Sequence, residues 1–150
     1  MLKHPRELGF TLGLKIRIDE FASIMTRTSD ASMSDVVYVA LFAEETTRLE
    51  KGEALKVGQT KGSLMNRWKG IAGTFSRDNL RDNEIEDRRK WLEQAKGKEV
   101  AVWVKPAGKT SIGYAQGLTQ HQFSTRCAEE EFLDEYYEPR LGIPLNRPNI

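Results

Sequence analysis

The segment from Val36 to Trp68 constrains the fold of this chain more than any other part of the sequence. It begins with Val36–Phe42 (VVYVALF), an apolar and β-branched run typical of a buried strand. A polar loop over Glu44–Glu53 follows, and Leu55–Gly58 resumes the sheet. Two strands joined by one loop pair most simply as an antiparallel hairpin.

A helix is expected directly after this hairpin. Ser63 can cap its first turn, and Leu64, Trp68 and Ile71 share one helical face. The segment therefore predicts a strand, a strand and a helix in succession.

The remaining elements point to a small α+β domain. Further strands are expected over Phe10–Phe21 and Glu99–Lys105, and further helices over Glu84–Lys96 and Thr125–Glu138. The predicted fold is a mixed or antiparallel three-stranded sheet flanked by helices. Residues 1–34 are interpreted as an N-terminal extension, formed by the first strand and a Ser- and Thr-rich connector over Thr26–Ser34, and residues 35–150 as the main domain.

The charge of the chain is uneven although its net value is only +1. Leu55–Arg81 carries a net charge of +5, whereas Cys127–Glu138 carries −6. A local basic patch can bind a polyanion even on a nearly neutral protein. At 150 residues, the chain is long enough for one domain with its own core.

The single cysteine, Cys127, excludes an internal disulfide and suits a reducing compartment. No apolar run reaches the length of a membrane span, and the N-terminus lacks the apolar core of a secretory signal. We therefore expect a cytoplasmic protein without a membrane partner.

Two tripeptides in this context resemble the motifs of the GIY-YIG nuclease family. Val36-Val37-Tyr38 stands where the family has its first tripeptide, and Lys56-Val57-Gly58 where it has the second. Arg67 follows in the next helix, and Asn146 lies near the C-terminal end. The chain departs from the pattern in carrying Lys56 in place of the second tyrosine, as some restriction-enzyme-like and phage-like branches also do.

The resemblance implies an endonuclease that hydrolyses DNA phosphodiester bonds with one Mg²⁺ or Mn²⁺ ion. The first-tripeptide tyrosine, here Tyr38, would activate the nucleophile or bind phosphate. The helix arginine, here Arg67, would stabilise the phosphate, and Asn146 would support the site. A glutamate on a later helix would hold the metal. Gln59 stands where related branches carry histidine, and an amide cannot titrate.

The chemistry of these side chains agrees with that reading. A phenolate is favoured beside an ammonium or a metal, so Lys56 could help Tyr38 to accept a proton from water. Arg67 stays charged and offers phosphate two parallel hydrogen bonds. Hydrolysis of a phosphodiester needs both a deprotonated water and neutralisation of phosphate charge.

The metal ligand is a choice between neighbouring glutamates of the last helix. Phe132, Leu133, Tyr136 and Tyr137 form its apolar stripe. Glu129 lies on the extension of that stripe and is the first choice, and Glu130 lies on its flank and is the second. Mg²⁺ needs few protein ligands, because phosphate and water fill the other positions.

Double-stranded DNA is the expected partner, and a homodimer would suit symmetric cutting. The cations expected to follow the DNA backbone are Lys61, Lys69, Arg77 and Arg81. Two alternatives stay open: a DNA-binding module of the same fold without cleavage activity, and a structural or interaction domain that docks through its acidic helix.

Overall fold

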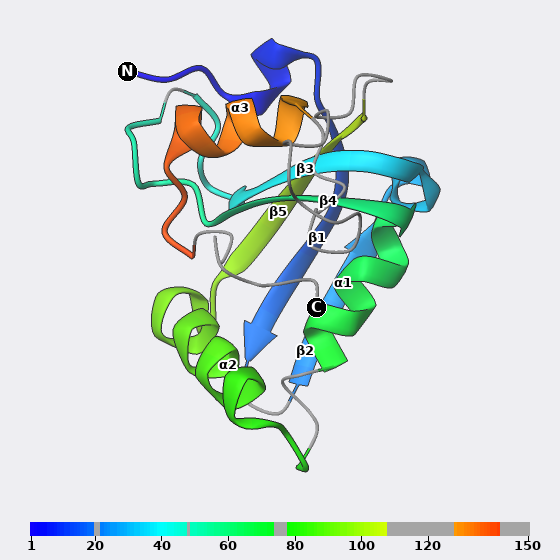
Figure 1. Ribbon diagram of the computed structural model, residues 1–150, viewed down its shortest axis with the longest axis vertical. Helices are drawn as coiled ribbons and strands as arrows, with labels where there is room; N and C mark the ends of the chain where they lie inside the picture. Colours follow the sequence, from blue (N-terminus) through cyan, green and yellow to red (C-terminus); the bar gives the residue numbers. More distant parts are fainter. Residues whose placement is uncertain (20–21, 48, 74–77, 108–127, 142–150) are drawn as a thin grey trace, which may run out of the picture.

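Five antiparallel strands form one sheet in the order β2-β1-β5-β3-β4 (Figure 1). This computed structural model describes residues 1–19, 22–47, 49–73, 78–107 and 128–141, and of residues 22 and 23 the backbone only. The strands are β1 (Thr11–Asp19), β2 (Ala22–Arg27), β3 (Ser34–Phe42), β4 (Lys56–Ser63) and β5 (Glu99–Pro106). The prediction of three strands is therefore wrong.

The two additional strands come from the N-terminal segment. Expected as one strand and a connector outside the sheet, it forms β1 and β2, and β1 pairs with both β2 and β5. The alternation of Leu14, Ile16 and Ile18 predicted β1, and all three side chains are fully buried. Pairing β1 with β5 joins residues about 90 positions apart, which a local sequence pattern does not reveal.

The helices are close to their predicted positions. They are α1 (Leu64–Gly73), α2 (Asp82–Ala95) and α3 (Ala128–Tyr137), and two short 3₁₀ helices, Pro5–Leu8 and Ser29–Ser32, precede β1 and β3. The Oγ of Ser63 accepts a hydrogen bond from the backbone N–H of Asn66 at 3.1 Å, so the predicted cap is present. None of the helices in the described ranges is long and apolar enough to cross a membrane.

The sheet has a different helical layer on each face. On one face, Trp68 of α1 and Trp91 of α2 pack against the side chains of β1, β3 and β5 that point their way. On the other face, Leu133 and Tyr137 of α3 pack against Val39 and its neighbours on β3 and β4. Side chains alternate between the faces along a strand, so each strand residue belongs to only one layer.

Candidate functional site at the β3–β4 hairpin

Tyr38 lies at the centre of β3 and points into the layer of α1 and α2. It pairs with Gly58 across the hairpin, and its side chain is fully buried. A Cβ added to Gly58 would lie 2.5 Å from the Tyr38 Cζ, so only glycine leaves room for the phenol ring there. The indole of Trp68 packs edge-on against the same ring, with the centroids 5.7 Å apart.

The hydroxyl of Tyr38 is buried and has no hydrogen-bond partner within the described parts of the chain. A buried polar group without a partner costs about 1–3 kcal/mol. Such a group calls for an explanation beyond packing, because phenylalanine would fill the same space without that cost.

Lys56 shares the face of Tyr38, whereas Arg67 turns to solvent. Lys56 pairs with Ala40, two residues beyond Tyr38 on β3, and is half-buried. Arg67 precedes the buried Trp68 on α1, and its side chain is exposed. Tyr38 and Lys56 therefore lie on one face of the hairpin, whereas Arg67 of α1 lies on the outer surface.

Glu129, the first choice for a metal ligand, forms an ion pair with Lys105. Both residues lie on the face of the sheet opposite to Tyr38. The Oε1 of Glu129 lies 2.7 Å from the Nζ of Lys105. Lys105 pairs with Val37 in β5–β3 register and also donates to the carbonyl of Leu8 at 3.2 Å. The ammonium group of Lys105 therefore occupies the position that a metal ion would take beside Glu129.

Glu130, the second choice, is the more deeply buried of the two carboxylates. Only 4% of it is exposed, and it precedes Leu133 and Tyr137 by three and seven residues on the buried side of α3. The predicted stripe pointed to Glu129 because it included Phe132, which is 56% exposed. The helix is thus rotated toward Glu130 relative to the predicted orientation.

The structure does not bring Tyr38 and α3 to the same face, but both layers meet at β4. This strand is the outer edge of the sheet, and both α1 and α3 contact it. Lys56 and Thr60 lie on the face of Tyr38, and Gln59 lies on the face of Val37 and α3. Among the described residues no further strand pairs with the outer edge of β4, so groups from both faces lie near this edge.

Of the other predicted residues, two lie outside the described parts of the chain and three lie within them. Arg77 and Asn146 are outside the described residues. Lys61 on β4 and Lys69 on α1 are exposed, and so is Arg81 at the start of α2. Across the described ranges, no group of three or more His, Cys, Asp and Glu side chains could hold a metal ion.

One basic residue at this end of the molecule was not predicted. Arg27 ends β2, is exposed, and contacts the sulfur of Met65 in α1. The segment containing it was interpreted as a connector. Apolar and polar residues do not alternate over residues 22–27 (ASIMTR), so periodicity gave no signal for this strand.

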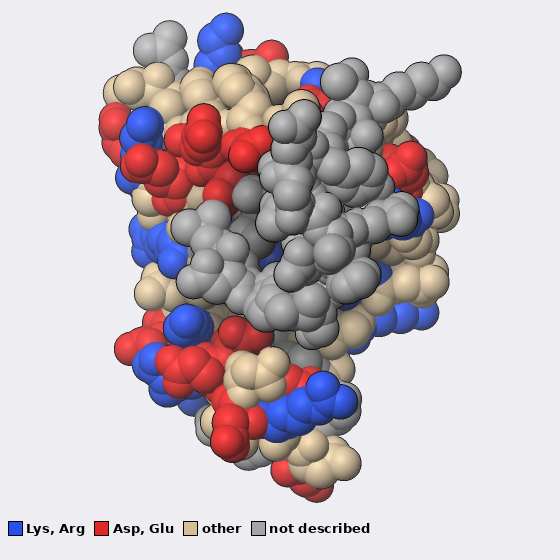
Figure 2. Space-filling model, in the orientation of Figure 1, with Lys and Arg blue, Asp and Glu red and all other residues tan. Residues whose placement is uncertain are grey.

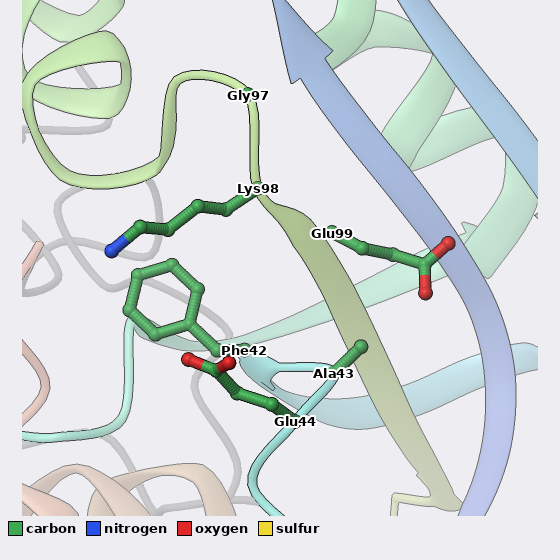
Figure 3. A pocket seen from close by; sticks show the side chains of 6 residues that line it. All are labelled: Phe42, Ala43, Glu44, Gly97, Lys98 and Glu99. Carbon is green, nitrogen blue, oxygen red and sulfur yellow. The ribbon is translucent and has the colours of Figure 1, made fainter.

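A separate pocket lies at the opposite end of β3 and carries mixed charges. Phe42, Gly97 and Lys98 line it together with Ala43, Glu44 and Glu99 (Figure 3). The Nζ of Lys98 lies 4.8 Å from the centroid of the Phe42 ring. Phe42 lies four positions along β3 from Tyr38, a distance of roughly 13 Å, so this pocket does not belong to the hairpin site.

Charge differs between α3 and the elements β2, β4 and α1. The elements β2, β4 and α1 contain five basic residues and no acidic one, whereas α3 contains five acidic residues and no basic one. Figure 2 shows acidic side chains gathered where Figure 1 places α3, and basic side chains along the side of α1. An approaching polyanion is thus attracted to α1 and repelled from α3.

Comparison with known proteins supports the fold. No protein-family model matches the chain. No curated protein matches it either. Among solved structures, a point mutant of EndoII from bacteriophage T4 is similar, with a TM-score of 0.56 and 16% identity over 92% of this chain and 95% of that one.

Proposed function

We propose that this chain is a nuclease that hydrolyses phosphodiester bonds of double-stranded DNA with one divalent metal ion. The observation that carries the proposal is the hairpin register. The two tripeptides that resemble the GIY-YIG motifs lie on paired strands with Tyr38 opposite Gly58, in a fold similar to that of EndoII. Arg67 follows in α1, as the resemblance requires.

The scissile phosphate would bind at the edge of β4 that faces away from β3. Arg67 offers it two parallel hydrogen bonds, and its charge does not depend on pH. Lys56 lies on the face of Tyr38 and would favour the phenolate form of Tyr38, which would then accept a proton from the attacking water. Tyr38 is buried in this structure, so this role requires that water reach its hydroxyl when DNA is bound.

Two carboxylates of α3, Glu129 and Glu130, are candidates for the metal ligand, and we assign that role to Glu130. A hard divalent ion prefers oxygen ligands and takes few from the protein when phosphate and water supply the others. Glu129 fits poorly, because Lys105 already neutralises it. Glu130 offers a buried carboxylate on the helix that contacts β4. When bound, the ion would neutralise charge on the phosphate.

A plasmid-nicking assay with Mg²⁺, and with EDTA in its place, tests the proposal. Cleavage should require the metal and fall by at least about 100-fold, the usual minimum for loss of a general base, in Tyr38→Phe. Glu130→Gln should lose cleavage likewise, whereas Glu129→Gln, the matched variant one position away, should retain most of it. Absence of metal-dependent cleavage by the wild-type protein would refute the proposal.

Tyr38→Phe also separates a catalytic tyrosine from a structural one. Its hydroxyl makes no hydrogen bond with the described residues, so removing it should leave the free energy of unfolding unchanged or raise it by up to about 1 kcal/mol. A purely structural tyrosine would show the same effect on stability without the loss of cleavage. A variant that is fully active would remove Tyr38 from the mechanism.

A second candidate function is a DNA-binding module without cleavage activity. The specific observation in its favour is the separation of Tyr38 and α3 on opposite faces of the sheet. It predicts salt-sensitive DNA binding without nicking under any metal. The same assay, run beside a binding measurement, distinguishes the two functions.

A further inference from the structure

The N-terminal strands contribute a second basic element next to α1. Arg27 pairs with Leu14 in the β2–β1 register, which places its side chain on the face that α1 covers. A pocket separates the two elements, and Met25, Arg27, Lys69 and Ala72 line it. One cation of this pocket therefore comes from β2 and the other from α1.

The cations of this region have no acidic partner among the residues that the structure describes. Arg27 contacts the sulfur of Met65, and within the described ranges Arg27, Lys69 and Arg67 form no ion pair. The nearby 3₁₀ helix contains Asp30, whose carboxylate accepts a hydrogen bond from the Oγ1 of Thr11 at 2.7 Å. Uncompensated cations in elements that contain no acid favour an anionic ligand from outside the chain.

We propose that Arg27 and Lys69 together bind a phosphate of the DNA backbone at the β2–α1 pocket. This inference rests on the proposed function and extends it to the N-terminal hairpin. Arg67 and Lys69 are both exposed on α1 but project about 200° apart around that helix, so a duplex held at Arg67 would cross α1 to reach this pocket. Contacts of this kind fix the register of the DNA and carry no sequence preference.

The other face of the same hairpin supplies matched controls. Arg17 pairs with Ile24, and Lys15 pairs with Thr26, so both project away from α1. Arg17 donates to the carbonyl of Gly97 at 2.7 Å, and Lys15 lies 4.0 Å from Glu99. Removing either charge changes the total charge by the same amount as removing Arg27 or Lys69.

The test compares Arg27→Gln and Lys69→Gln with Arg17→Gln and Lys15→Gln in the full-length protein. Binding to a short labelled duplex is measured by fluorescence anisotropy in EDTA over a range of salt concentrations, and nicking is measured separately in Mg²⁺. Each phosphate contact contributes about 0.9 to the slope of log K against log salt. Because the two cations share one phosphate, Arg27→Gln combined with Lys69→Gln should lower that slope by about this amount. Each single variant should lower it by a smaller amount that Arg17→Gln and Lys15→Gln do not show, and Arg27→Lys should restore it.

Three outcomes separate this inference from the proposed function. Equal slopes for Arg27→Gln and Arg17→Gln, with cleavage by the wild type intact, would overturn the β2–α1 contact alone. A lowered slope for Arg27→Gln without nicking by the wild type would support the contact and overturn the nuclease. If the wild-type protein neither binds nor cleaves DNA, both are overturned.

Discussion

At the scale of single residues, the hairpin site is governed by the fit between Tyr38 and Gly58. The motif could be recognised in the sequence because residue types and their order suffice for it. Burial of the phenol could not, since it depends on Trp68 and on strands far away in the chain. The sequence likewise predicted an acidic ligand on the last helix, but the choice between Glu129 and Glu130 depends on Lys105, which belongs to another strand.

Gly58→Ala should destabilise the protein through this contact. The new methyl group would lie 2.5 Å from the Tyr38 Cζ and 3.0 Å from its Cε1. Trp68 already packs edge-on against the same ring. Overpacking of this kind costs about 1–3 kcal/mol in the free energy of unfolding. Gly62→Ala is the control on the same strand, because its nearest atom, the Thr60 Oγ1, is 3.9 Å away. Equal urea midpoints for the two variants would contradict the close contact.

At the scale of elements, α3 is held to the sheet by its polar ends as much as by its apolar face. Tyr137 is fully buried and donates from its hydroxyl to the carbonyl of Lys3 at 2.7 Å, which joins α3 to the N-terminal segment. Periodicity predicted this helix and its approximate ends. The partner at Lys3, more than 130 residues away, was beyond any local pattern.

Tyr137 should also make the protein sensitive to alkali. Burial raises the pKa of Tyr137, with smaller contributions from Tyr136 and Glu7. In the unfolded chain a tyrosine titrates near pH 10, so above that pH the unfolded state loses its proton first and the folded state is disfavoured. Stability should therefore fall as pH rises through about 10.

Chemical denaturation of the wild type and of Tyr137→Phe at neutral and alkaline pH checks this. At neutral pH the variant should be less stable by about 1 kcal/mol, the value of one hydrogen bond. Its stability should fall less steeply with alkali than that of the wild type. Parallel curves for the two proteins would exclude Tyr137 as the source.

At the scale of the whole molecule, α1 and α3 carry opposite charge on opposite faces of the sheet. Composition alone could indicate that the basic and acidic stretches exist, since their residues are contiguous in the chain. Their placement on opposite faces follows from the sheet, because α1 and α3 approach β4 from different sides. The protein therefore presents one side to a polyanion, and the N-terminal strands, which belong to the same sheet, extend that side.

This polarity predicts unequal effects of charge removal on DNA binding. Arg67→Gln combined with Lys69→Gln on α1 should lower the slope of log K against log salt by at least about 0.9, the value for one lost phosphate contact, because Arg27 still contacts the phosphate that it shares with Lys69. Glu131→Gln combined with Glu135→Gln, two exposed residues of α3, should change it by much less, although the net charge changes by the same magnitude with the opposite sign. The measurement is the same anisotropy titration in EDTA. Mutations on α3 that change the slope as strongly as those on α1 would show that DNA contacts both layers, and the one-sided approach would have to be abandoned.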